Sequence, residues 1–202
     1  SLINLRIKEV YAVIGYKSFE IKKYLKKYEK SIELKFIFNK NYSTYGSSFS
    51  WISAEKEWLK KKKNILMLHG DIVFDEKLLL NIFNDKNKDV IGTVKKKFNL
   101  IKKSGFVVDK TNKNTIKSIN HKKFYKKKIF NEIACINKFS IETQIEIFKF
   151  MKKYFKKVSK KHTWEYVIND YITSENKILY TNKSKFYYWH NVNTKQDYLN
   201  LI

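Results

Sequence analysis

Short apolar runs alternate with amphipathic segments along almost the whole chain. Runs such as Val10–Ile14 and Ile65–Leu68 have the length of strands, whereas the segment after Ser140 carries apolar residues at helical spacing. This alternation is typical of α/β layer folds, in which helices cover a sheet. The chain has 202 residues, enough to bury a sizeable core, and we expect one domain over residues 1–202.

The individual elements follow from these patterns. The expected strands are Val10–Ile14, Leu34–Phe38, Ile65–Leu68, Val90–Val94, Phe106–Asp109, Ile116–Ile119, Ile133–Ile136 and Lys185–Trp189. The expected helices are 18–30, 49–60, 75–83 and 141–155, followed by helices that begin after Thr163 and Thr194. Ser18, Ser140, Thr163 and Thr194 are candidate N-caps, and Thr194 with Asp197 has the spacing of a capping box. The wholly apolar run Ile65–Leu68 predicts a strand buried on both faces.

The net charge of +24 suggests an anionic partner, but the type of basic residue argues against nucleic acid. Arg6 is the only arginine, and proline is absent. Proteins that bind the phosphates and bases of nucleic acids favour arginine, because its guanidinium group can form two parallel hydrogen bonds. We therefore interpret the lysine clusters at 60–63, 95–97, 126–128 and 156–161 as solvated surface. The charge would still attract anionic substrates such as nucleotides.

Cysteine usage and hydropathy limit the class of protein further. The single Cys135 excludes an intrachain disulfide and a cysteine-based zinc site, and we expect it to be an inert core residue. No apolar run approaches the roughly 18 residues needed to span a bilayer. We expect a cytoplasmic protein without a membrane span.

The sharpest local feature is His69-Gly70-Asp71, which follows the apolar strand Ile65–Leu68 and precedes a short helix. Ligands of open α/β sheets bind beyond the carboxyl ends of the strands. A carboxylate there suits Mg²⁺, which takes few protein ligands and completes its shell with water and phosphate oxygens. Gly70 would let a ligand approach the backbone closely. The alternative is that Asp71 only caps the following helix.

Several motifs occur in an order that points to one family. They are Val10–Tyr16, which ends in Gly-Tyr; Asn41-Tyr42 with Gly46-Ser47-Ser48-Phe49-Ser50-Trp51; Leu66–Phe74, similar to "LLNGDVVF"; Trp164–Ile168, similar to "W-E-D-V-I"; and Trp189–Thr194 with Asp197-Tyr198, similar to "W-x-E-I-D-T-x-x-D-Y/L". Together they resemble the nucleotidyltransferase family of the GT-A-like fold. That family includes sugar-phosphate nucleotidyltransferases and phosphocholine cytidylyltransferases.

The resemblance implies a GT-A-like α/β fold whose mixed sheet is mostly parallel, with helices on both faces. It also implies Mg²⁺-dependent nucleotidyl transfer from a nucleoside triphosphate, with CTP favoured, to a small phosphate or phosphonate acceptor. Phosphocholine and sugar 1-phosphates are examples, and pyrophosphate is released. The attacking oxygen is already anionic near pH 7, so catalysis would rest on alignment and charge neutralisation rather than on a general base.

The resemblance also assigns residues. It places Asp71 as the catalytic metal ligand and aligns Asn193 with a second, usually acidic, ligand. It places Ser47, Ser48 and Gly70 beside the nucleotide, and Trp164 with Glu165 around a cationic acceptor group. Two structural alternatives remain: Ser47 and Ser48 could be helix caps, with Ser48 the better candidate, and Trp164 could be a core residue beside a solvated Glu165.

The sequence departs from the family at its N-terminal side. The family's first strand, its glycine-rich triphosphate loop and a downstream Pro-Lys have no counterpart in residues 1–202. We therefore expect either an N-terminally truncated piece, completed by a preceding segment or a fused domain, or a chain that shows little transfer alone. A metal-dependent GT-A glycosyltransferase and a non-enzymatic basic module that binds RNA or an acidic partner are the alternative functions.

Overall fold

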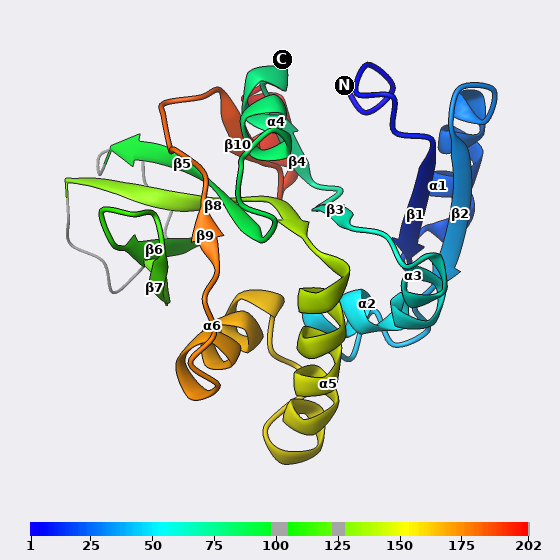
Figure 1. The fold of residues 1–202 in the computed structure, drawn as a ribbon. Helices are drawn as coiled ribbons and strands as arrows, with labels where there is room; N and C mark the ends of the chain where they lie inside the picture. Colours follow the sequence, from blue (N-terminus) through cyan, green and yellow to red (C-terminus); the bar gives the residue numbers. More distant parts are fainter. Residues whose placement is uncertain (98–104, 123–127, 202) are drawn as a thin grey trace. The chain divides into compact units, whose positions relative to one another are not determined.

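The computed structural model describes residues 1–97, 105–122 and 128–201. Lys126 and Lys127, which belong to one of the expected surface clusters, lie outside these residues. The chain divides into two compact units (Figure 1). Unit 1 contains Ser1–Lys63 and Gln144–Ile168, and unit 2 contains Asn64–Thr143 and Asn169–Ile202. Within the described parts of the chain, no helix is both long and apolar enough to cross a membrane.

Unit 1 begins with two parallel strands, β1 (Glu9–Ile14) and β2 (Glu33–Phe38), joined by α1 (Ser18–Leu25) and the short 3₁₀ helix η1 (Lys26–Tyr28). Parallel strands need such a crossover because a tight turn can join only antiparallel neighbours. The expected helix of residues 18–30 is therefore shorter and ends in a 3₁₀ turn. Ser18 is not its cap, because Lys17 holds the N-cap position with a left-handed backbone (φ 50°).

The rest of unit 1 is helical. The expected helix 49–60 is two helices, α2 (Ser47–Ser53) and α3 (Glu55–Lys61), with Ala54 between them. Unit 1 also holds most of α5 (Ile141–Lys157) and the first turn of α6 (Trp164–Ser174). Its core is aromatic: the Trp51 ring lies edge-on to Phe148 and Trp164, with centroid distances of 6.1 and 6.3 Å.

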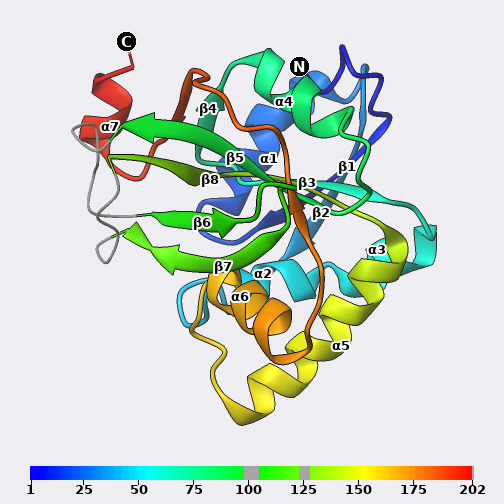
Figure 2. The ribbon, with the colours of Figure 1, turned by 60° about the vertical axis from the view of Figure 1, so that its left-hand side comes forward.

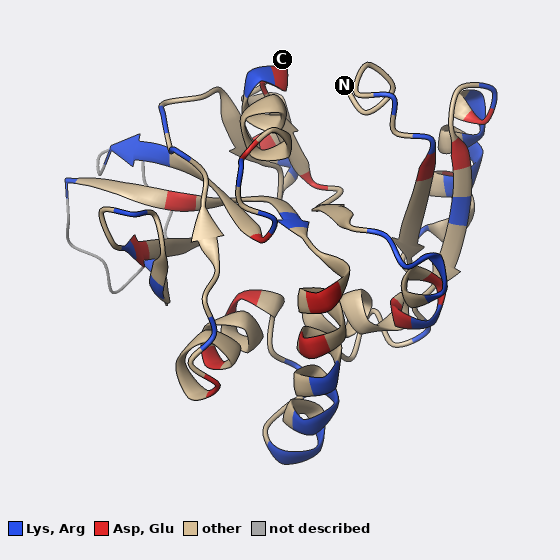
Figure 3. Cartoon of the chain, in the orientation of Figure 1, with Lys and Arg blue, Asp and Glu red and all other residues tan. Residues whose placement is uncertain are grey.

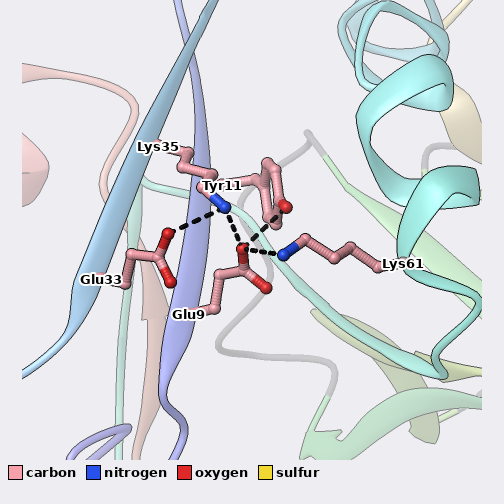
Figure 4. A network of polar contacts seen from close by, with 5 residues as sticks. All are labelled: Glu9, Tyr11, Glu33, Lys35 and Lys61. Carbon is pink, nitrogen blue, oxygen red and sulfur yellow. Dashed lines mark hydrogen bonds and ion pairs between the residues drawn. The ribbon is translucent and has the colours of Figure 1, made fainter.

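Unit 1 carries a polar network on its strands (Figure 4). The Glu9 carboxylate accepts hydrogen bonds from Lys35 and, at 2.8 Å, from the Tyr11 hydroxyl, and its Oε1 lies 3.1 Å from the Lys61 ammonium. Lys35 also contacts Glu33 at 2.9 Å. The hydrogen bond from Lys35 is the main cause that lowers the pKa of Glu9 from its ordinary value of 4.5 to about 2.

Unit 2 is built on a sheet with the strand order β7-β6-β8-β5-β9 (Figure 2). These strands are β5 (Val90–Lys97), β6 (Phe106–Lys110), β7 (Ile116–His121), β8 (Ile129–Phe139) and β9 (Tyr180–Thr181). A further strand, β3 (Ile65–Leu68), also pairs with β8, and β4 (Ile72–Phe74) pairs with β10 (Trp189–Asn191). The helices α4 (Glu76–Phe83) and α7 (Lys195–Leu199) complete the unit together with the later part of α6.

The expected mixed α/β architecture is confirmed, but the expectation of a mostly parallel sheet is wrong. Among the pairings of the described strands, β1–β2 and β5–β9 are parallel and the others are antiparallel. The residues of β3 are half-buried, not enclosed on both faces. The expected strand 133–136 is the centre of the longer β8, and the late strand is 189–191 instead of 185–189.

An irregularity in β8 lies beside the end of β3. The register between β5 and β8 shifts between Ile91 and Thr93, and Cys135 adopts a left-handed backbone (φ 56°). The Cys135 carbonyl accepts a 3.1 Å hydrogen bond from the backbone of His69, the first residue after β3. Opposite this bulge, a Cβ on Gly92 would lie 2.2 Å from the Ile136 carbonyl oxygen, so glycine is required for the close approach.

Candidate functional site

Asp71 lies between β3 and β4 in unit 2, and its side chain is 45% exposed. The helix that follows is capped by Asp75, whose carboxylate accepts a 2.8 Å hydrogen bond from the backbone of Lys77. The alternative reading of Asp71 as the helix cap is therefore wrong. A Cβ on Gly70 would meet no atom within 4 Å, so the backbone before Asp71 borders open space.

A distant segment of the sequence lies directly beside Asp71. Strand β10 runs antiparallel to β4 with Asn191 opposite Ile72, and the backbone nitrogen of Val192 donates a 2.7 Å hydrogen bond to the Asp71 carbonyl. Immediately afterwards, Thr194 and Asp197 form the expected capping box of α7. The structure thus brings the expected metal ligand Asp71 and the segment 191–193 to the same place.

The two asparagines of this segment have different surroundings. Asn193 is exposed, and its backbone nitrogen donates a 3.0 Å hydrogen bond to the Asp197 carboxylate. The Asn191 side-chain oxygen is buried and has no hydrogen-bond partner among the described residues. Carboxylate and amide carbonyl oxygens are ligands that suit Mg²⁺. Within the described ranges, no group of three or more His, Cys, Asp or Glu could hold a metal ion.

The backbone of His69 binds the β8 bulge through the Cys135 carbonyl. Its ring nitrogen Nδ1 lies 3.8 Å from the Asp71 carboxylate, beyond hydrogen-bond distance. Burial lowers the pKa of His69 below its ordinary value, against the smaller opposing effect of the Asp71 charge. The imidazole is therefore neutral near pH 7 and adds no positive charge to the site.

Sequence reasoning missed a charged cluster near β10. Lys122 and Glu132 form a buried ion pair with side chains 5% and 7% exposed. The Lys96 ammonium donates a 2.8 Å hydrogen bond to the Trp189 carbonyl and lies 5.2 Å from the centre of that ring. Burial is the main cause that raises the pKa of Glu132 and lowers that of Lys96. Nothing in the sequence marked Lys122 and Glu132, because lysines are spread over the entire chain. The interpretation of the cluster 95–97 as solvated surface is wrong for Lys96, which is half-buried against Trp189.

The backbone around this ion pair is tightly constrained. Gly105 has φ 118°, a conformation that side-chain-bearing residues rarely adopt, and its carbonyl accepts a 3.0 Å hydrogen bond from the Lys122 backbone. A Cβ on Gly105 would lie 2.9 Å from the Glu132 carboxylate oxygen. Glycine at this position therefore makes room for the buried charge pair.

The serines expected beside the nucleotide lie in unit 1 and bind backbone groups. The Ser48 hydroxyl is fully buried and donates to the His162 carbonyl at 2.7 Å, while the Ser47 hydroxyl accepts from the Trp164 backbone at 3.1 Å. Gly46 is the N-cap of α2, so the alternative of Ser47 or Ser48 as the cap is wrong. A Cβ on Gly46 would lie 2.2 Å from the His162 carbonyl oxygen, which explains glycine in this motif.

The residues expected around a cationic acceptor group are also in unit 1. Trp164 is 1% exposed and packs on Trp51, so its ring has the core environment of the structural alternative. Glu165 is 7% exposed and is not the solvated residue that this alternative assumed. The assignment of both residues to the acceptor stays a prediction.

Solved structures similar to this chain share one fold. The CTP:phosphocholine cytidylyltransferase from Streptococcus pneumoniae aligns with a TM-score of 0.76 and 15% identity, covering 99% of this chain and 79% of that one. The inositol-1-phosphate CTP transferase from T. maritima aligns with a TM-score of 0.74 and 15% identity, covering 97% and 76%. A protein described as a glucose-1-phosphate thymidylyltransferase from Bacillus anthracis aligns with a TM-score of 0.68 and 13% identity, covering 98% and 76%.

These likenesses show that the chain has the nucleotidyltransferase fold, as the sequence motifs predicted. At such low identity they carry the fold alone. No curated protein sequence matches the chain. One family model matches residues 3–202, nearly the full sequence, and the chain therefore belongs to the family described as "Domain of unknown function (DUF6564)".

Proposed function

We propose that this protein catalyses Mg²⁺-dependent nucleotidyl transfer from a nucleoside triphosphate, CTP by preference, to a small phosphate-bearing acceptor, with release of pyrophosphate. The observation that carries the proposal is the placement of Asp71 on this fold. Its partly exposed carboxylate follows β3, and the Val192 hydrogen bond to its backbone places the segment 191–193 beside it. A carboxylate and an asparagine carbonyl in such a position suit a phosphate-bound magnesium ion.

In this proposal Asp71 is the main protein ligand of the metal. Asn193 is the second ligand according to the sequence motif. When bound, the ion would neutralise phosphate charge and orient the triphosphate. An asparagine carbonyl adds no negative charge, so a site with one carboxylate binds Mg²⁺ more weakly than a site with two.

The buried Lys122 and the half-buried Lys96 would supply positive charge for the phosphates. Lys122 is paired with Glu132, and the additional Lys96 leaves this cluster with a net positive charge. Electrostatic interactions are strong where water is excluded, so a phosphate that reached Lys96 would gain more from it than from an exposed lysine. Burial already disfavours the charged form of Lys96, and an anion would reverse this effect.

The reaction needs no general base from the protein. The attacking oxygen of a phosphate or phosphonate is anionic near pH 7, and the nearby imidazole of His69 is neutral. The residues of the site therefore align two anionic substrates and stabilise the charge that develops on the leaving pyrophosphate.

The test is pyrophosphate release from CTP in the presence of Mg²⁺ and either phosphocholine or a sugar 1-phosphate. The protein is assayed as residues 1–202 and also together with any residues that precede Ser1 in its reading frame. Release that depends on an acceptor and is lost in Asp71→Ala supports the proposal. Sugar transfer from a nucleotide sugar overturns the proposal. Salt-sensitive RNA binding without turnover, in both residues 1–202 and the longer protein, also overturns the proposal.

A further inference from the structure

The helix α1 and the turn η1 of unit 1 have an exceptional exposed face. No residue of α1 or η1 is buried. Phe19 is 77% exposed and Tyr24 is 61% exposed, and Tyr16 immediately before the helix is 67% exposed. Aromatic side chains so open to water are costly on a free surface and commonly mark an interaction site.

Lysines surround these aromatic rings. Lys22, Lys23 and Lys26 follow Phe19 at three, four and seven residues, so they share its side of the helix. The Lys27 ammonium lies 3.7 Å from the centre of the Tyr24 ring. Figure 3 shows the lysines along α1 and the following turn. Glu20 is the only acidic residue of α1 and η1, so the face is strongly basic.

The lysine content of the chain alone does not explain this face. The last turns of α5 are equally rich in lysine, with Lys152, Lys153, Lys156 and Lys157 exposed. There, however, the apolar residues Ile147, Phe148 and Met151 are fully buried, as expected of a solvated amphipathic helix. In α1 the aromatic side chains remain outside together with the lysines.

We propose that this basic–aromatic face, formed by Tyr16, Phe19, Lys22, Lys23, Tyr24, Lys26 and Lys27, binds the surface of an anionic lipid bilayer. Lysines attract anionic headgroups, and aromatic rings among them enter the boundary between headgroups and acyl chains. A helix on the outside of a protein, such as α1, presents a convex face, and a convex face can lie against a flat bilayer. Single-stranded nucleic acid is usually held in a basic groove that tracks its backbone.

The test is co-sedimentation of the full chain with two kinds of vesicle, one of phosphatidylcholine alone and one of two parts phosphatidylcholine to one part phosphatidylglycerol. We expect binding to the anionic vesicles only. Lys22→Ser with Lys23→Ser lowers the partition coefficient at least about tenfold. Phe19→Ser with Tyr24→Ser lowers it by a similar factor at unchanged net charge.

The matched control is Lys156→Ser with Lys157→Ser, which removes the same charge from α5. It changes binding less than about threefold if the α1 face is the contact. An equal loss in this control, no binding by the unaltered chain, or full binding by the Phe19 and Tyr24 variant overturns the proposal. The proposal also fails if the same aromatic substitutions abolish RNA binding or dissociate a dimer while vesicle binding persists. Thermal melts establish that each variant is folded.

Discussion

The backbone nitrogen of Val192 donates a 2.7 Å hydrogen bond to the carbonyl oxygen of Asp71. This bond continues the pairing of β10 with β4 by one step and depends on no side-chain atom of Asp71. The position of the carboxylate is therefore set by backbone pairing, and the side chain remains available for a ligand. A substitution at Asp71 can remove the carboxylate without disturbing the strands.

We predict that Asp71→Ala abolishes binding of Mn²⁺, used as a probe for Mg²⁺, and leaves the melting temperature within about one degree, because exposed side chains contribute little to stability. Titration followed by electron paramagnetic resonance measures the free ion. The control is Asp75→Ala, which removes the cap of α4 and costs about 1 kcal/mol of stability but keeps Mn²⁺ binding. Equal Mn²⁺ binding by the Asp71→Ala variant would contradict the metal site.

The buried pair Lys122–Glu132 predicts a strongly non-additive pair of substitutions. Lys122→Met or Glu132→Leu alone leaves a buried charge without its partner and lowers the free energy of unfolding by about 3–5 kcal/mol. The double variant removes both charges and recovers most of this loss. Urea denaturation of the four proteins gives the coupling energy. Additive effects of the two substitutions would show that the pair is not coupled in solution.

Two fully buried asparagines of unit 2 provide a matched comparison. Neither polar side-chain atom of Asn137 has a hydrogen-bond partner among the described residues, so Asn137→Leu is expected to raise the free energy of unfolding by about 1–2 kcal/mol. Asn182 accepts from Thr93 and donates to Asn81, both at 2.7 Å. Asn182→Leu should therefore cost about 2–4 kcal/mol. Chemical denaturation measures both, and a destabilised Asn137→Leu would refute the first expectation.

The lowered pKa of Glu9 predicts part of the acid sensitivity of unit 1. Its pKa falls from 4.5 to about 2 on folding, so the charged form stabilises the protein fully above about pH 4.5. This contribution is lost as the pH falls from 4.5 towards 2. Glu9→Gln should lower stability at pH 7 by less than about 1 kcal/mol, because the pairs are near the surface.

The same variant should also show a shallower loss of stability over the acid range. Stability is measured by thermal melts at a series of pH values and at low salt. Glu33→Gln is the control, since this side chain is 60% exposed and its ion pair is with Lys35. A steeper acid transition in Glu9→Gln than in the unaltered chain would contradict the network.

Local patterns in the sequence were sufficient for many elements. Ile65–Leu68 has the predicted bounds, and the capping box of Thr194 and Asp197 is present. The order of the motifs predicted the nucleotidyltransferase fold. These features depend on residues near one another in the chain, whose spacing sets backbone conformation directly.

Other local expectations failed where a side chain or backbone group binds a segment that is distant in the sequence. Ser48 looked like a cap, but its hydroxyl donates to the His162 carbonyl, and Gly46 approaches that carbonyl too closely for any side chain. Likewise, the sequence left Asp71 as a candidate cap for the following helix, and the structure shows that Asp75 is the cap. Propensity ranks such candidates but does not say which one has a tertiary partner.

The sequence by itself determined many of the elements, their order and the position of Asp71 after a strand. Tertiary structure decided which strands pair, so a sheet expected to be mostly parallel proved mostly antiparallel. It also decided that Val192 binds Asp71 and that Lys122 meets Glu132 in the interior. The physical reason is that pairing and burial depend on the register between distant segments, and a lysine destined for the interior has the same local pattern as one on the surface.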